Sequence, residues 1–252
     1  MGKKILLSLL NEKNGDSGYA NLGYYANGDF VPLKTYYFKG NKSNFSTYVY
    51  TNNLSKLRSV AASSLAQFCY YSSNITLETD NIEFSNLETI EEYGCSYAFN
   101  GLSGKLNKTD GTKFTSVSFP KLTTIANYGL QYGFYSCSSL KTISFPELTT
   151  VKSNGLYYAF NSCTNLTSVS FPKLSTVDSY VLQYAFRNCT GLTSISFPEL
   201  TTIGSYALYN TFYECEGLTE VHFHYSLKGN SQCTASYMGC SNATVYFDLG
   251  SA

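Results

Sequence analysis

A 26-residue phrase repeats along the sequence and constrains the fold more than any other feature. LTSISFPELTTIGSYALYNTFYEC occupies residues 192–215, and closely similar stretches begin at Leu166 and Leu140. The same period is kept by four prolines and four cysteines: Pro120, Pro146, Pro172, Pro198, Cys137, Cys163, Cys189 and Cys215. A fixed period of this length is typical of a solenoid, in which each unit exposes an apolar face that only the next unit covers.

Each unit combines a strand pattern with a helix pattern. In LTSISF, Ile195 and Phe197 lie two residues apart and share one face, while the serines between them share the other. Pro198 then ends the strand, because proline cannot donate a ladder hydrogen bond. The apolar positions of SYALYNTFYEC fall at i, i+1, i+4, i+5 and i+8, which predicts a short helix over this segment: Ala207, Leu208, Thr211, Phe212 and Cys215.

Looser copies of the phrase define the extent of the array. NLETIEEYGCSYAF at 86–99 and KLRSVAASSL at 56–65 both match KLTTIANYGL and the residues after it. We therefore predict an α/β solenoid of short parallel strands and short helices over 48–247, capped at both ends. Its N-terminal cap would be residues 1–47, an insertion loop would lie at about 101–113, and residues 248–252 would form a tail.

The repeated residues carry a resemblance to a known family. The phrase C-x-x-L-x-x-[IV]-x-F-P-x-L-x-x-[IV], followed by a Y-A-F segment, resembles the BspA-type leucine-rich repeat, roughly over residues 55–247. The copies here are longer than is usual for such repeats. The resemblance implies a right-handed leucine-rich-repeat superhelix and a role in surface adhesion or recognition.

Composition excludes several classes of function. The 17 basic and 17 acidic residues cancel, whereas a nucleic-acid-binding protein normally has a clustered basic excess. No apolar run is long enough to span a membrane. MGKKILLSLL resembles the start of a signal peptide, but its apolar part is short and polar NEKNGDSG follows it. We interpret it as a first strand, with a degraded signal peptide as the alternative.

The eight cysteines invite a disulfide interpretation, which the repeat argues against for the central four. Cysteines of one column would have Cβ atoms about 4.8 Å apart, the spacing of parallel strands, which exceeds the usual separation in a bridge. A ladder of buried free thiols is therefore predicted. Bridges would fit better near the ends, between Cys69 and Cys95 or between Cys233 and Cys240, and this disulfide state is left open.

The two histidines lie together in TEVHFH. Glu220, His222 and His224 alternate, so they would project from one face of a strand, where two His and a carboxylate could bind zinc. The equivalent positions one repeat earlier are Ser194, Ser196 and Pro198, which offer no further ligand. A solvated strand is therefore favoured over a metal site, and no cofactor is expected.

Tyrosine is the most informative residue for function, since the chain has 24 Tyr and no Trp. Many tyrosines lie in columns opposite the Leu/Phe stripe. Their rings would either stack on one another and shield the repeat layer, or form an adhesive strip for a protein or glycan partner. The candidate binding residues are Tyr128, Tyr132, Tyr157, Tyr158, Tyr180, Tyr184, Tyr206 and Tyr209. The strands would present a second surface of Ser and Thr.

Enzyme motifs are absent from the sequence. It contains no G-x-S-x-G, no P-loop and no H-E-x-x-H, and its two histidines lie near one end. We expect a non-enzymatic adhesion module that recognises a protein or glycan at a bacterial or host surface, and hence an extracellular or cell-surface location. One alternative is a phage or prophage tail-associated receptor-binding protein, located in the virion. Another is a structural spacer without its own ligand. The sequence sets no oligomeric state.

Overall fold

The computed structural model describes residues 83–101 and 115–248 in full, and elsewhere the backbone pairing of short strands. In the first 60 residues these are β1 (Tyr19–Ala20), β2 (Gly23–Ala26), β3 (Asp29–Pro32), β4 (Tyr36–Tyr37), β5 (Ser46–Val49) and β6 (Ser59–Val60). Strands β1 and β4 pair antiparallel, as do β2 and β3, whereas β5, β7 (Asn74–Leu77) and β10 (Leu106–Lys108) pair parallel. The predicted N-terminal cap and insertion loop otherwise lie outside the described residues.

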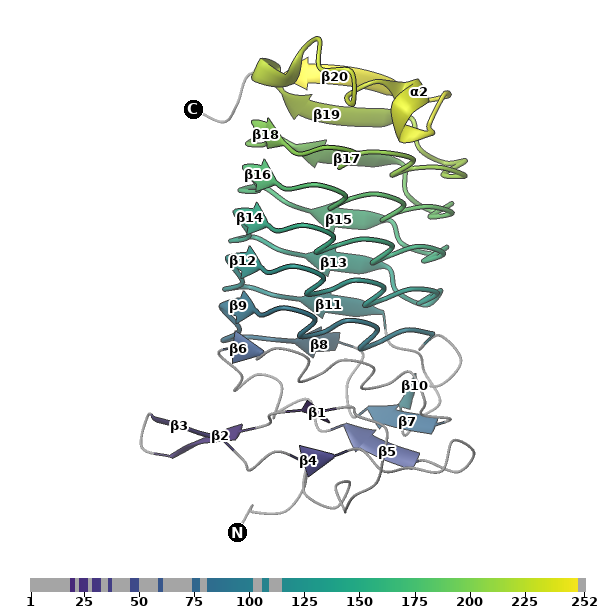
Figure 1. Ribbon diagram of the computed structural model, residues 1–252. Coiled ribbons are helices and arrows are strands. Elements are labelled where there is room, and N and C mark those ends of the chain that lie inside the picture. Colours follow the sequence, from purple (N-terminus) through teal and green to yellow (C-terminus); the bar gives the residue numbers. More distant parts are fainter. Residues whose placement is uncertain are drawn as a thin grey trace.

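Parallel strands stacked one above another form the solenoid (Figure 1). The longer strand of each repeat lies in one stack: β8 (Asn81–Glu83), β11 (Ser116–Ser118), β13 (Thr142–Ser144), β15 (Ser168–Ser170), β17 (Ser194–Phe197), β19 (Glu220–His224) and β20 (Thr244–Asp248). The shorter strands form a six-stranded sheet: β6, β9 (Thr89–Ile90), β12 (Thr124–Ile125), β14 (Thr150–Val151), β16 (Thr176–Val177) and β18 (Thr202–Ile203). Ile143 pairs with Val117 and with Val169, so the 26-residue register is confirmed.

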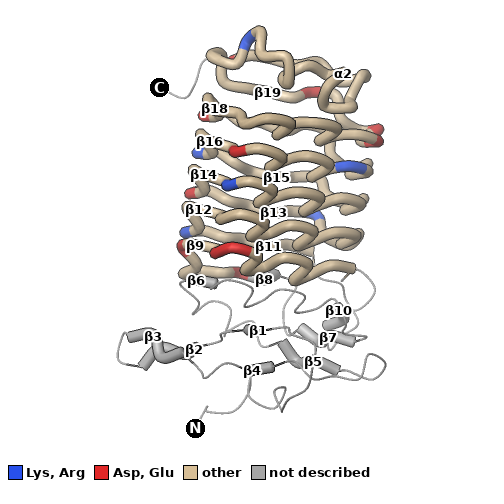
Figure 2. The backbone as a smooth tube through the Cα atoms, in the orientation of Figure 1, with Lys and Arg blue, Asp and Glu red and all other residues tan. Residues whose placement is uncertain are grey.

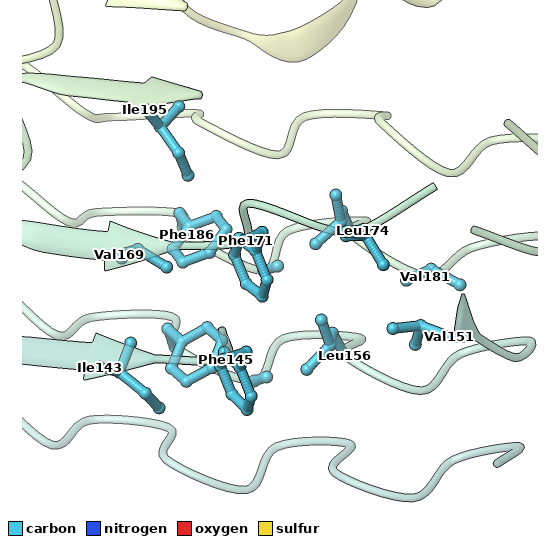
Figure 3. Packing of buried hydrophobic residues seen from close by; sticks show 14 of the residues in the cluster. Ile143, Phe145, Val151, Leu156, Val169, Phe171, Leu174, Val181, Phe186 and Ile195 are labelled. Carbon is cyan, nitrogen blue, oxygen red and sulfur yellow. The ribbon is translucent and has the colours of Figure 1, made fainter. Parts of the chain in front are cut away.

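Phenylalanine columns fill the interior between the strands and the rest of each repeat. The ring of Phe145 stacks 5.0 Å from Phe119 and 5.2 Å from Phe171. It also meets Phe160 of a second column edge-on at 6.3 Å. Side chains of successive repeats lie directly above one another, as Phe171 does above Phe145 (Figure 3). The apolar face of each repeat is therefore covered by the next repeat, as the sequence period predicts.

The cysteine column is a ladder of buried free thiols, as predicted. Each thiol donates a hydrogen bond to a phenylalanine carbonyl of the preceding repeat, for example Cys189 Sγ to Phe160 O at 3.1 Å. Cys95, Cys233 and Cys240 are also free and buried, so the end bridges proposed for them are not formed in the structure. Cys69 lies outside the described residues.

The predicted helix in each repeat is wrong. Residues such as 153–162 form consecutive turns, and the helices among the described residues are η3 (Tyr225–Leu227) and α2 (Ala235–Met238) of the last repeat. Alternate amides donate within the repeat, as Gly155 N does to Lys152 O at 2.8 Å. The amides between them donate to the next repeat, as Asn154 N does to Ser179 O at 3.0 Å. A helix could not form these bonds between repeats, because its amides bond to carbonyls four residues back.

The turns depend on a left-handed residue at every fourth position. In one repeat these are Asn154, Tyr158 and Ser162, with φ of 58°, 53° and 61°. The equivalent residues elsewhere also have positive φ: Tyr93, Tyr97, Gly101, Tyr128, Tyr132, Ser136, Tyr180, Tyr184, Asn188, Tyr206, Asn210 and Glu214. A period of four fits the apolar spacing i, i+4, i+8. In a true α-helix, residues eight apart would point in directions that differ by about 80°. The helix pattern of the sequence was thus a four-residue turn pattern.

Charged residues are sparse and lie mostly along the sides of the stack (Figure 2). Along the side with the short strands, Lys and Glu alternate between repeats, and Lys173 Nζ lies 2.7 Å from Glu147 Oε2. Both side chains are exposed, so the pair contributes at most about 1 kcal/mol and acts mainly on register. The predicted right-handed superhelix and the caps stay predictions.

One side chain of the last repeat forms hydrogen bonds with backbone groups at the C-terminal end of the turn layer. The Gln232 amide donates to Gly204 O at 2.9 Å and accepts from Leu208 N at 3.4 Å. It therefore replaces backbone partners that a further repeat supplies elsewhere in the array.

Candidate functional site: the tyrosine face

The turn segments carry the eight tyrosines predicted from the sequence, which we call the tyrosine face. It comprises Tyr128, Tyr132, Tyr157, Tyr158, Tyr180, Tyr184, Tyr206 and Tyr209. Six of these adopt the left-handed conformation, which is unusual for a bulky residue. Of the three residues between successive left-handed positions, the first two, such as Ala159 and Phe160, are buried in the core. The four-residue turn period thus holds the tyrosines on the outside of the solenoid.

The central column of the tyrosine face is a continuous ring stack. Tyr132 stacks 4.7 Å from Tyr97 and 4.9 Å from Tyr158, and Tyr158 stacks 4.8 Å from Tyr184. Asn210 ends the column, where its amide Nδ2 donates to the Tyr184 hydroxyl at 3.3 Å. Stacked rings that shield the repeat layer were one of the two alternatives considered for the tyrosines, and the structure contains this stacking. Such pairs contribute about 0.5–1.5 kcal/mol each beyond burial.

A second column is interrupted. Tyr128 stacks on Tyr93 at 4.7 Å, and Tyr180 stacks on Tyr206 at 5.5 Å, but Asn154 occupies the repeat between these two pairs.

The third column, which contains Tyr157 and Tyr209, is discontinuous as well. Its rings contact the central and second columns through ring edges. Tyr157 meets Tyr132 and Tyr158 edge-on at 5.7 and 4.6 Å. Tyr209 meets Tyr184 and Tyr206 in the same way, at 5.9 and 6.4 Å. These contacts join seven of the eight rings of the tyrosine face in one network, whereas Tyr128 stacks on Tyr93.

Burial keeps the hydroxyls of Tyr132 and Tyr158 neutral at physiological pH. Burial raises the pKa of Tyr158 to about 12 and also raises the pKa of Tyr132, with neighbouring tyrosines adding to both shifts. Exposure increases toward the C-terminal repeats, where Tyr206 is 52% exposed. Arg187 and Glu214 form an ion pair on the same turn segments, with Arg187 Nε 3.2 Å from Glu214 Oε2. The Arg187 guanidinium also lies 5.3 Å from the Tyr213 ring centroid. Such a surface offers aromatic contact area and hydroxyls without a net charge.

The strand surface is lined by hydroxyls, as predicted. Ser168, Ser170, Ser194 and Ser196 are exposed. Just before the short strands, threonine hydroxyls donate back to the preceding repeat, as Thr149 Oγ1 does to Thr123 O at 3.2 Å. Because these threonine hydroxyls already bond to the neighbouring repeat, they are less available to a partner. The strand surface therefore presents fewer distinctive groups for recognition than the tyrosine face does.

The histidines lie on the outer face of β19 but do not combine as the zinc hypothesis requires. His222 Nδ1 lies 2.7 Å from Asp248 Oδ2 and its Nε2 lies 3.4 Å from Glu220 Oε2. His224 Nδ1 is engaged by Ser226, whose backbone amide donates to it at 3.1 Å. Among the described residues, no group of three His, Cys, Asp or Glu side chains is placed to hold a metal ion.

Several partners of these sites were missed from the sequence. Tyr93 and Tyr97 extend two columns, and the looser copy at 86–99 already aligned them with Tyr128 and Tyr132. Asp248 was missed because it pairs in register with His224, and its carboxylate reaches His222 only as a diagonal contact between β19 and β20. None of the helices within residues 83–101 and 115–248 has the length and apolar character to traverse a bilayer.

The fold and its repeat define a leucine-rich-repeat solenoid. Residues 107–244, more than half of the chain, match six copies of the family described as the BspA type leucine-rich repeat region. The chain therefore belongs to the BspA-type leucine-rich repeat family, and the resemblance found in the sequence is confirmed. Proteins with these repeats are often surface adhesion proteins and typically not enzymes.

A solved structure is also similar to the chain. It is the leucine-rich repeat protein of T. pallidum (TpLRR), which is 19% identical over 76% of this chain and 74% of its own, with a TM-score of 0.45. No curated protein matches the chain in sequence.

Proposed function

We propose that the chain is a non-enzymatic adhesion module whose tyrosine face binds a protein or glycan partner at a bacterial or host surface. The observation that carries the proposal is the network of partly exposed tyrosine rings held outward by the left-handed turns. Tyrosine gives a large contact area at low entropic cost and keeps a hydroxyl for hydrogen bonding. An extracellular or cell-surface location is part of the proposal, and family membership supports it. The alternative role, that of a phage or prophage tail-associated receptor-binding protein, stays a prediction from the sequence alone.

The test is a binding screen of the purified chain against bacterial cells, glycan arrays and extracellular-matrix proteins. A triple variant, Tyr132→Ser, Tyr158→Ser, Tyr184→Ser, is screened beside the wild type. A matched control carries Ser168→Thr, Ser194→Thr and Ser196→Thr on the opposite, strand surface. We expect a partner that the tyrosine variant loses by at least tenfold in affinity and that the control retains.

Other outcomes overturn the proposal. Binding that the tyrosine variant retains would move recognition to the strand surface or to the ends of the array. Absence of any binding partner in the screen would favour the spacer interpretation, in which the tyrosines only shield the turn layer.

A further inference from the structure

One column of the tyrosine face lacks a ring in its middle. Tyr128, Asn154 and Tyr180 occupy equivalent positions in three successive repeats and share the left-handed conformation, with φ of 56°, 58° and 62°. Asparagine tolerates this conformation well, so its presence alone has a backbone explanation. The absent ring has a separate consequence for the two tyrosines on either side.

Within the part of the chain that the structure describes, each of these two tyrosines has one ring face without an aromatic neighbour. Tyr128 is parallel to Tyr93 within 1°, and Tyr180 is parallel to Tyr206 within 3°. Stacking therefore runs along the column, and the opposite faces of Tyr128 and Tyr180 turn toward the repeat of Asn154. Tyr157 does not cover them, because its ring packs on Tyr132 and Tyr158 of the adjacent column.

The interval between Tyr128 and Tyr180 matches the space for one aromatic ring. The two residues are two repeats apart, which is about 10 Å at the usual strand spacing. In the adjacent column the same interval separates Tyr132 from Tyr184, and it is filled by the ring of Tyr158 at 4.9 and 4.8 Å. A ring from outside could therefore stack on both tyrosines at ordinary aromatic distances.

The amide of Asn154 supplies a polar group beside this position. Among the described residues its side chain makes no hydrogen bond, and it is partly exposed. Asn210, which ends the adjacent column, shows the matching chemistry by donating its amide to the Tyr184 hydroxyl. A phenol inserted between Tyr128 and Tyr180 would find a similar donor, which favours tyrosine over phenylalanine.

We propose that a protein partner inserts an aromatic side chain, preferably tyrosine, between Tyr128 and Tyr180 at Asn154. The inserted ring completes the interrupted column and acts as the anchor of the interface. The inference rests on the proposed function, because it specifies which group the tyrosine face takes up. It selects a protein partner rather than a glycan.

The test uses N-acetyl-tyrosinamide as the probe in saturation-transfer NMR with the full chain. N-acetyl-leucinamide and methyl glucoside serve as comparison probes. Asn154→Tyr fills the column from within, while Gln183→Tyr is the matched control, because it adds a tyrosine to the third column and leaves the interval open. Circular dichroism of both variants verifies their folding.

We expect saturation of the tyrosinamide ring protons in the wild type, a loss of at least fivefold in Asn154→Tyr and no loss in Gln183→Tyr. No saturation, equal saturation in Asn154→Tyr, or stronger saturation of methyl glucoside would each overturn the inference. The proposed function fails separately. If a surface partner depends on Tyr132, Tyr158 and Tyr184 but binds Asn154→Tyr as it binds the wild type, only the inserted ring is refuted.

Discussion

The inner phenylalanine columns and the central tyrosine column are both aromatic stacks with one ring in each successive repeat. Their spacings are close, with Phe145 5.2 Å from Phe171 and Tyr132 4.9 Å from Tyr158. The inner column continues from Phe84 to Phe247 without a gap, and all but its last ring are fully buried. The outer columns are partly exposed and stop where asparagine replaces tyrosine.

The difference lies in what replaces a missing ring. Inside, removal of a ring leaves a cavity whose walls relax only in part, so the cost is large. Outside, water or another molecule takes its place. The inner columns therefore hold the fold, whereas a ring of the outer columns can be replaced at a smaller cost in stability.

Alkali should have the largest effect, because it acts on every repeat. Burial raises the pKa of Tyr158 to about 12 and raises the pKa of the Cys163 and Cys189 thiols well above 9.0. In the unfolded chain these groups ionise nearer pH 9 to 10, so their contribution to stability is complete below that range and is lost as pH rises through the folded-state values. Urea unfolding followed by circular dichroism should show a free energy of unfolding that falls from pH 9 to 12. A constant value over that range would contradict the burial of these groups.

Phe171→Ala tests the inner column directly. The ring is 1% exposed and packs on Phe145, Phe186 and Phe197. Its removal should lower the free energy of unfolding by about 3–5 kcal/mol. Chemical denaturation measures this loss, and a loss below 1 kcal/mol would mean that the inner column does not hold the repeats together.

Gly204→Ala tests the close approach of neighbouring turns. A Cβ at Gly204 would clash with the backbone carbon of Asp178, so the backbone of one of the two repeats must shift to accommodate it. Overpacking of this kind should cost about 1–3 kcal/mol. Chemical denaturation measures this loss of stability. Gly229→Ala serves as the comparison, because nothing lies within 4 Å of a Cβ built at Gly229. Gly229 has a φ of 90°, so only a cost at Gly204 that clearly exceeds the cost at Gly229 supports the steric explanation.

Tyr158→Asn should have the smallest effect. Asparagine already occupies equivalent left-handed positions at 154 and 210, so the backbone is kept and only the ring contacts are lost. We expect a loss of about 1–2 kcal/mol, because the stacked pairs with Tyr132 and Tyr184 are partly exposed and each contribute near the lower end of the usual range for aromatic pairs. A loss as large as that of Phe171→Ala would remove the distinction between inner and outer columns.

The strands could be predicted from the sequence, whereas the turns could not. Alternation of Ile195 and Phe197 with serine, closed by Pro198, specifies a strand with one buried face, and β17 has this pattern. The turn segments failed because a short apolar stripe fits periods of 3.6 and 4.0 nearly equally well. The signal that separates them was present, since Gly101, Asn188 and Asn210 occupy left-handed positions and both residue types favour that conformation.

The candidate site was predictable as a surface but not as a set of contacts. Its tyrosines fall in columns that the period makes visible. Their stacking, the hydrogen bond from Asn210 to Tyr184 and the unpaired ring faces beside Asn154 depend on side-chain placement. The contact of His222 with Asp248 was also hidden, because it runs diagonally between β19 and β20, whose register pairs Asp248 with His224.

The central claim is that the fold depends on the inner columns and not on the tyrosine face. Its most direct test is the free energy of unfolding of the triple variant Tyr132→Ser, Tyr158→Ser, Tyr184→Ser, measured beside that of Phe171→Ala. We predict that the triple variant keeps a native circular dichroism spectrum and loses no more stability than the single phenylalanine variant. An unfolded triple variant, or one that loses clearly more, would show that the tyrosine columns hold the solenoid together and are not free for recognition.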